Sequence, residues 1–159
     1  MTAFTEVNTS GKGDGTEMDF LVHHMLKTSA QRLPDKEALV HGQQRLTYSE
    51  VERIVNALAY DLQKAGLERG DRVGILLEPS IAQAVSIFAA AKAGAVFVPI
   101  NHLLFPEQVA HIMRDCRMKA VITTKTKLAS LAGVIADIPS LAFALASGEG
   151  DSPEVPFPL

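Results

Sequence analysis

The chain has a single cysteine, Cys116, among its 159 residues. One thiol cannot form a disulfide within the chain, so the disulfide-stapled secreted folds are excluded and a reducing, cytoplasmic location is expected. Cys116 falls on the apolar side of a predicted helix, and the sequence offers no activating base beside it. We therefore expect a small buried side chain at this position rather than a nucleophile.

Long apolar runs and charge patches are also missing. No stretch approaches the roughly 18 residues that a membrane span needs, and no charged and then apolar leader is typical of a secretion signal. The 15 Lys and Arg residues and the 18 Asp and Glu residues are mixed along the chain and give a net charge of −3. The sequence therefore predicts neither a membrane span nor a nucleic-acid partner.

Motifs that carry chemistry are absent in usable form. The segment 9–15, Thr-Ser-Gly-Lys-Gly-Asp-Gly, has glycine where a phosphate loop needs Ser or Thr, and no strand or helix is predicted beside it. His23 and His24 are adjacent and project about 100° apart, and none of the five histidines has a partner at i, i+4. We expect no catalytic residue, no metal site and no bound cofactor within this chain.

Apolar side chains, in contrast, are plentiful. Hydrophobic residues make up 47% of the chain, and the mean hydropathy is +0.14. That is on the apolar side for a small free-standing domain. Because no membrane span accounts for these extra hydrophobic residues, we expect some of them to form a surface that contacts another part of the same protein or a second subunit.

Residues 72–116 carry the central unit. Apolar runs at 73–77 and 95–100 flank an alanine-rich helix, which Ser80 and Gln83 open as a capping box. This pattern predicts a β-α-β unit with parallel strands and a right-handed crossover. Because small side chains let a helix lie close to a sheet and also be covered on its outer side, this unit is expected to be deeply buried.

Helical or alternating spacing, together with Pro, Gly and capping residues, predicts the other elements. In order these are a helix at 19–32 with Asp19 as N-cap, strands at 37–41 and 45–47 around a turn at 42–44, a helix opened by the capping box of Thr47 and Glu50 and ended by Gly66 and Gly70, a helix begun by Pro106, a strand at 120–123, a helix at 125–132 and a strand at 141–145. Buried stripes are expected on three of the helices, at Val22, Met25, Leu26, Ser29 and Leu33, at Val51, Ile54, Val55, Leu58, Ala59 and Leu62, and at Val109, Ile112, Met113 and Cys116.

This order predicts an α/β fold in which a largely parallel sheet is flanked by helices on both faces. We divide the chain into a disordered leader at 1–17, an α/β subdomain at 18–147, and a tail or truncated connection at 148–159. The tail contains Pro153, Pro156 and Pro158, which cannot propagate a helix or a central strand.

Open parallel sheets bind ligands beyond the carboxyl ends of their strands. The predicted strand ends offer Glu78, the pair Asn101 and His102, and the segment 123–127, Thr-Thr-Lys-Thr-Lys. Each group has an alternative role: Glu78 beside a helix dipole, Asn101 in a turn, and the threonines as helix caps. The segment 123–127 is the most suited to phosphate, although it lacks glycines for close backbone approach.

Four strings of residues, in one register from Asp19 to Leu145, resemble the N-terminal part of the adenylate-forming superfamily. They are Leu46–Val51 (LTYSEV), Gly70–Ile75 (GDRVGI), Ile87–Asn101 (IFAAAKAGAVFVPIN) and Pro106–Ile112 (PEQVAHI). The superfamily comprises acyl-CoA synthetases, peptide-synthetase adenylation domains and luciferases. The segments 18–24 and 35–40 are most similar to acyl-CoA ligases linked to exosortase systems.

The resemblance implies that a carboxylic acid and ATP give an acyl-adenylate and pyrophosphate with Mg²⁺, followed by transfer to coenzyme A, as in fatty acid metabolism. The superfamily's phosphate loop, adenine- and ribose-binding acids and lid lysine lie downstream of the part resembled here. No family catalytic residue can therefore be carried over. The resemblance implies a scaffold fragment, inactive alone, whose partner is the remainder of the same polypeptide.

Two alternatives stay open from the sequence. One is a self-contained, flavodoxin-like nucleotide-binding module that uses the segment 123–127 at a helix start. The other is an association module without catalysis, in which the alanine-rich surface meets a second subunit in a homo-oligomer.

Overall fold

The computed structural model describes residues 21–148. The elements follow the predicted order: α1 (Val22–Arg32), β1 (Glu37–His41), β2 (Gln44–Thr47), α2 (Tyr48–Lys64), β3 (Arg72–Ile75), α3 (Ile81–Lys92), β4 (Val96–Pro99), α4 (Pro106–Asp115), β5 (Ala120–Thr124), α5 (Lys125–Ile135) and β6 (Phe143–Ser147). The predicted leader at 1–17 lies outside the described residues, as does all of the predicted tail except Gly148.

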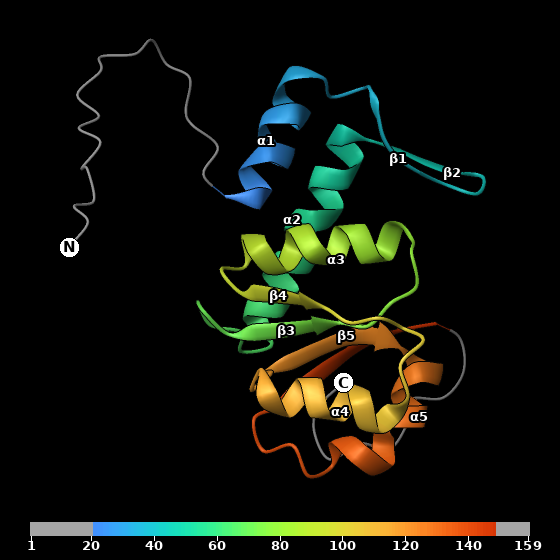
Figure 1. The fold of residues 1–159 in the computed structure, drawn as a ribbon. Helices are drawn as coiled ribbons and strands as arrows, with labels where there is room; N and C mark the ends of the chain where they lie inside the picture. Colours follow the sequence, from blue (N-terminus) through green and yellow to red (C-terminus); the bar gives the residue numbers. More distant parts are fainter. Residues whose placement is uncertain (1–20, 149–159) are drawn as a thin grey trace, which may run out of the picture.

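The centre of the fold is a four-stranded parallel sheet in the order β4-β3-β5-β6. Helices cover both faces, so the predicted α/β class is confirmed (Figure 1). The inner strands β3 and β5 are almost entirely buried and are short apolar runs rather than alternating ones, whereas β4 at one edge is only partly covered. Strands β1 and β2 form a separate antiparallel hairpin.

On one face of the sheet, α3 contacts β3 and β4 and also packs against α1 and α2, and α2 passes α3 to reach the strands (Figure 1). The alanines of α3 explain this double contact, since Ala89, Ala90 and Ala93 are buried and leave room for helices to approach. The covering that we expected on the outer side of α3 thus comes from α2 and α1 of the same chain.

On the other face, α4 and α5 pack over the sheet with a second cluster of buried side chains. Gly74 of β3 faces this cluster, and a β-carbon added there would lie 2.8 Å from the Met118 sulfur and 3.2 Å from Ile100 Cδ1. A side chain at position 74 would therefore overlap the core, and the glycine is needed for close packing rather than for backbone freedom.

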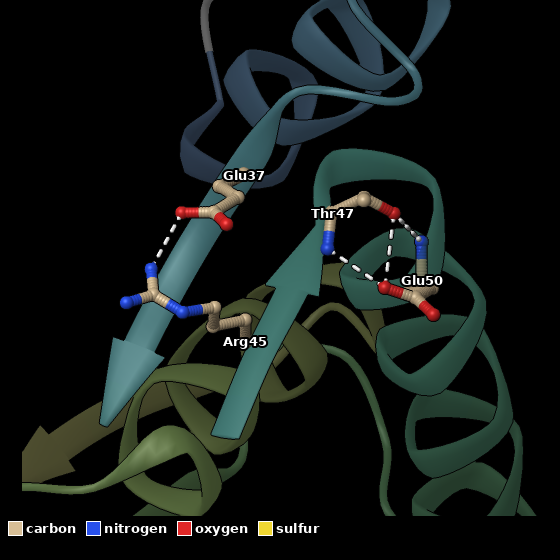
Figure 2. A network of polar contacts seen from close by, with 4 residues as sticks. All are labelled: Glu37, Arg45, Thr47 and Glu50. Atoms are coloured by element: carbon tan, nitrogen blue, oxygen red, sulfur yellow. Dashed lines mark hydrogen bonds and ion pairs between the residues drawn. The ribbon is translucent and has the colours of Figure 1, made fainter. Parts of the chain in front are cut away.

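The hairpin and the start of α2 carry a small polar network (Figure 2). Arg45 pairs with Glu37 across the strands at 2.8 Å. Thr47 accepts the Glu50 N–H at 3.3 Å, and Glu50 accepts the Thr47 N–H at 2.8 Å, so the predicted capping box is confirmed. These bonds from the Thr47 backbone and hydroxyl lower the pKa of Glu50.

The structure corrects several details. Helix α1 begins at Val22 with Leu21 in the cap position, while Asp19 lies outside the described residues. Its stripe is only partly buried, because Leu26 is covered whereas Val22, Met25 and Leu33 are exposed. The box of Ser80 and Gln83 is half formed: Ser80 accepts the Gln83 N–H, but the Gln83 amide donates to the Leu77 carbonyl.

Cys116 is half-buried and packs against the second cluster, in keeping with an apolar role. Cys116 is the C-cap residue of α4, and its backbone carbonyl accepts a hydrogen bond from the Arg72 Nε–H at 2.8 Å. The observed boundaries of several strands and of α5 differ from the predicted ones by one to three residues, because helices fray and strand ends depend on the neighbouring strand.

Candidate functional site at the carboxyl edge of the sheet

The strands β3 and β5 are neighbours, yet the chain leaves them in different directions. From β3 it passes to β4 on one side, and it then crosses back to β5 on the other side. This reversal is a topological switch point, where open α/β sheets leave a crevice at the carboxyl ends of the strands.

A cleft of about 730 Å³ lies at this edge. Its walls come from the segments that follow all of β3, β4, β5 and β6: Leu76, Leu77, Glu78, Ser80, Ala82, His102, Leu103, Thr124, Thr126, Lys127, Ser130, Ser147 and Gly148. The three groups chosen from the sequence therefore meet here, because each contributes at least one residue to the lining.

Thr124 and Lys127 both line the cleft. Thr124 accepts the Lys127 N–H at 3.2 Å and so caps α5, the role that the sequence favoured for a threonine in this segment. The Lys127 ammonium donates to the carbonyls of His102 at 2.8 Å and Leu104 at 3.4 Å. Lys127 thus ties the loop after β4 to the first turn of α5.

The remaining predicted residues have mainly structural contacts. Thr123 is fully buried and donates its hydroxyl to the Leu76 carbonyl at 2.9 Å. Asn101 accepts the Leu103 N–H at 3.0 Å, which is the turn chemistry given as its alternative role. Glu78 is exposed at the cleft, two residues before the N-cap of α3.

The cleft lining therefore holds one ammonium, from Lys127, and one carboxylate, from Glu78. Hydroxyls and this single cation can position a polar molecule, whereas a triphosphate needs several cationic groups or a metal ion. Within residues 21–148 no group of three or more His, Cys, Asp or Glu side chains could hold a metal ion.

Sequence reasoning missed an apolar groove of about 430 Å³ on the face of the sheet that α2 and α3 cover. Its lining includes Ile54 and Leu58 of α2, Val85 of α3 and Leu145 of β6. Ile54 and Leu58 were recognised as part of the apolar stripe of α2. The groove beside them depends on the position of β6 in the sheet, which cannot be predicted from a local sequence pattern.

It also missed a buried polar cluster among the first three helices. Glu52 of α2 pairs with Lys92 of α3, and each is largely covered. His23 of α1 has a buried Nδ1 without a hydrogen-bond partner, and burial, His24 and Lys92 lower its pKa. The two histidine rings lie edge to face at 4.5 Å. The ring of His23 as a whole is half-buried, and it is the Nδ1 side that is covered.

Comparison with known proteins defines the class to which this architecture belongs. Residues 26–153 match the family model of the AMP-binding enzymes, and the chain belongs to that family. Its sequence is 33% identical over 105 residues to tyrocidine synthase 1 of Brevibacillus parabrevis, an alignment that covers 66% of this chain and 10% of that protein.

Among solved structures, the anthranilate CoA ligase AuaEII in complex with anthranoyl-AMP aligns with a TM-score of 0.80 and 27% identity, over 88% of this chain and 27% of that one. An artificially fused adenylation-PCP di-domain from Klebsiella oxytoca aligns with a TM-score of 0.62 and 31% identity, over 64% of this chain and 19% of that one. The chain thus spans a minor part of the proteins that it matches. No helix of the described part is long and apolar enough to cross a bilayer.

Proposed function

We propose that the chain is the N-terminal scaffold portion of an ATP-dependent acyl-CoA ligase. The full-length enzyme would convert a carboxylic acid and ATP into an acyl-adenylate and pyrophosphate with Mg²⁺, and then transfer the acyl group to coenzyme A. The observation that carries the proposal is the fold of the sheet and its helices, which aligns with a CoA ligase over 88% of the chain.

The same comparison favours a CoA ligase over a peptide synthetase. The adenylation di-domain has the higher sequence identity, but it aligns over 64% of the chain and with the lower TM-score. The wider structural match to the CoA ligase is therefore the support for the acyl-CoA assignment.

We further propose that this portion is inactive by itself. Adenylation moves negative charge onto pyrophosphate, and a metal ion with cationic side chains must stabilise that charge. Among residues 21–148, the cleft lining supplies one ammonium, that of Lys127, which already donates to two carbonyls. In this view the cleft and the surrounding surface position groups that the rest of the enzyme provides.

Pyrophosphate release tests the proposed inactivity. The chain is incubated with ATP, Mg²⁺, coenzyme A and a panel of fatty and aryl acids, beside a full-length acyl-CoA ligase as positive control. We expect no release above a blank without protein. Turnover that rises with the concentration of the chain would refute the proposal.

The cleft at the switch point supports one alternative, a self-contained nucleotide-binding module. Calorimetry with ATP, AMP and FMN separates the two functions, because a scaffold should bind none of them more tightly than about millimolar, near −4 kcal/mol. Micromolar binding that Lys127→Met weakens at least tenfold would favour the nucleotide-binding module.

A further inference from the structure

The apolar groove of about 430 Å³ beside α2, α3 and β6 offers little to a polar ligand. None of its thirteen lining residues is charged. Its two buried hydroxyls are already used, because Ser86 donates to the Ala82 carbonyl at 2.7 Å and Thr123 donates to the Leu76 carbonyl at 2.9 Å. The groove is therefore suited to apolar side chains, which need no hydrogen-bond partner when water is displaced.

Four large apolar side chains along this groove are only half covered. They are Ile54 and Leu58 of α2, Ile81 of α3 and Leu145 of β6, and each is half-buried within residues 21–148. Val55, which is next to Ile54 in the sequence, is completely buried in the core of the same face. Because all four half-buried side chains border one groove, a single apolar segment lying there would remove more of each from water.

The chain leaves the sheet beside this groove. Ala146 and Ser147 both line it, and β6 ends at Ser147. Gly148 follows with a φ of 111°, a conformation in which glycine lets a chain change direction without a steric penalty. Phe157 is nine residues beyond Gly148, and nine extended residues span about 30 Å. The segment that follows β6 can therefore reach every part of the groove.

The sequence of this segment, 149–159, matches the groove in its second half. Its three acidic residues, Glu149, Asp151 and Glu154, all come first, whereas residues 155–159 are Val-Pro-Phe-Pro-Leu and carry no charged side chain. The prolines restrict φ and so reduce the number of conformations that the unbound segment can adopt, which lowers the entropic cost of binding. The uncharged half can thus enter the uncharged groove while the acidic half stays in water.

We propose that residues 155–159 bind in the apolar groove of the same chain and cover its half-buried side chains. Phe157 is the anchor, because an aromatic ring buries the largest apolar area of the five residues. Since a short linker holds the segment at an effective concentration of about millimolar, even a weak contact is populated. The inference does not depend on the proposed enzymatic role, because the same segment follows β6 in a scaffold and in a nucleotide-binding module.

Photo-crosslinking in the full chain tests this contact. Benzoylphenylalanine is incorporated in place of Phe157, and mass spectrometry locates the crosslinked peptides after irradiation. We expect crosslinks within one chain to the peptides that carry Ile54, Leu58 or Leu145, with a yield that does not depend on protein concentration. The same group in place of Asp151, in the acidic half of the segment, should give none of these crosslinks.

A substitution in the groove shows whether the crosslinks report binding there. Leu58→Glu places a charge among the apolar lining residues and should abolish them. Phe105→Glu is the matched control, because this side chain is 73% exposed and precedes α4 on the opposite face of the sheet, and it should keep them. Crosslinks to α4 instead of α2 or β6, crosslinks only between two chains, or an unchanged yield in Leu58→Glu would overturn the proposal.

Methyl NMR gives a second measurement that leaves the groove itself unaltered. An aromatic ring shifts the signals of methyl groups that it contacts, so Phe157→Leu should move the methyl signals of Leu58 and Leu145 although an apolar side chain remains at position 157. Phe4→Leu removes a ring near the other end of the chain and should leave both signals in place. Methyl signals of Leu58 and Leu145 that stay unchanged in Phe157→Leu would also overturn the proposal.

Discussion

At the scale of single residues, two glycines illustrate opposite demands of the same fold. A β-carbon at Gly74 would lie 2.8 Å from the Met118 sulfur, whereas one at Gly133 of α5 would meet nothing within 4 Å. Gly74→Ala should therefore lower the free energy of unfolding by about 1 to 3 kcal/mol through overpacking. Gly133→Ala should raise it by about 0.5 to 1 kcal/mol, because alanine favours the helix.

Urea unfolding followed by circular dichroism measures both changes. The decisive result is the sign of the change in the free energy of unfolding, because both substitutions replace a glycine with an alanine. A neutral Gly74→Ala would mean that Met118 moves aside at little cost, which its flexible thioether would allow.

His23 makes stability depend on pH. Its pKa lies below the ordinary value of 6.5, first because burial disfavours the charged ring and then because His24 and Lys92 repel it. The unfolded chain therefore binds a proton at a higher pH than the folded chain does. As the pH falls below about 6.5, the free energy of unfolding should decrease.

His23→Leu should reduce this loss between pH 7 and pH 5, because the leucine neither titrates nor leaves a buried nitrogen without a partner. Thermal unfolding across that range checks it. His111→Leu, at an exposed position of α4, serves as the control and should keep the wild-type slope. An unchanged slope in His23→Leu would show that another group controls the acid response.

At the scale of elements, the capping box of α2 has its own pH signature. The Thr47 backbone and hydroxyl lower the pKa of Glu50 below 4.5. Its contribution to stability is thus fully present above that pH and is lost as the pH falls through the pKa of the folded chain. Glu50→Gln can keep the hydrogen bond without titrating, so it should show a smaller loss of stability below pH 4.5 than the wild type. Acid titration of the urea midpoint measures the difference, and equal profiles would contradict the assignment.

At the scale of the whole molecule, the sheet joins two clusters of buried side chains. Leu62 of α2 belongs to the cluster on one face, and Leu131 of α5 to the cluster on the other. Because β3 and β5 lie between the two clusters, we expect the two layers to unfold together. Leu62→Ala and Leu131→Ala should each lower the free energy of unfolding by about 2 to 5 kcal/mol.

The two tyrosines of the chain, Tyr48 and Tyr60, both lie on α2 and report on one layer by fluorescence. Circular dichroism reports on all the helices. In Leu131→Ala the two signals should still share one midpoint. A loss of helicity that precedes the tyrosine transition would show that the layer of α4 and α5 unfolds by itself.

The sequence by itself determined the order and type of the elements. The alternation of apolar runs with helical spacing, the capping box at Thr47, Pro106 at the start of α4 and Gly66, with its positive φ, after α2 all act within a few residues. Local hydrogen bonds and backbone restrictions need no distant partner, so these features could be predicted. The same holds for the three groups at the strand ends, because parallel strands bring their carboxyl ends to one edge.

Only the tertiary structure decided the strand order, the exposure of Met25 on α1, the second half of the box at Ser80 and the covered Nδ1 of His23. Each of these depends on contacts between segments tens of residues apart, where burial and competing partners outweigh local preference. A periodic pattern states which side of an element is apolar, but the packing of the whole chain determines what covers it.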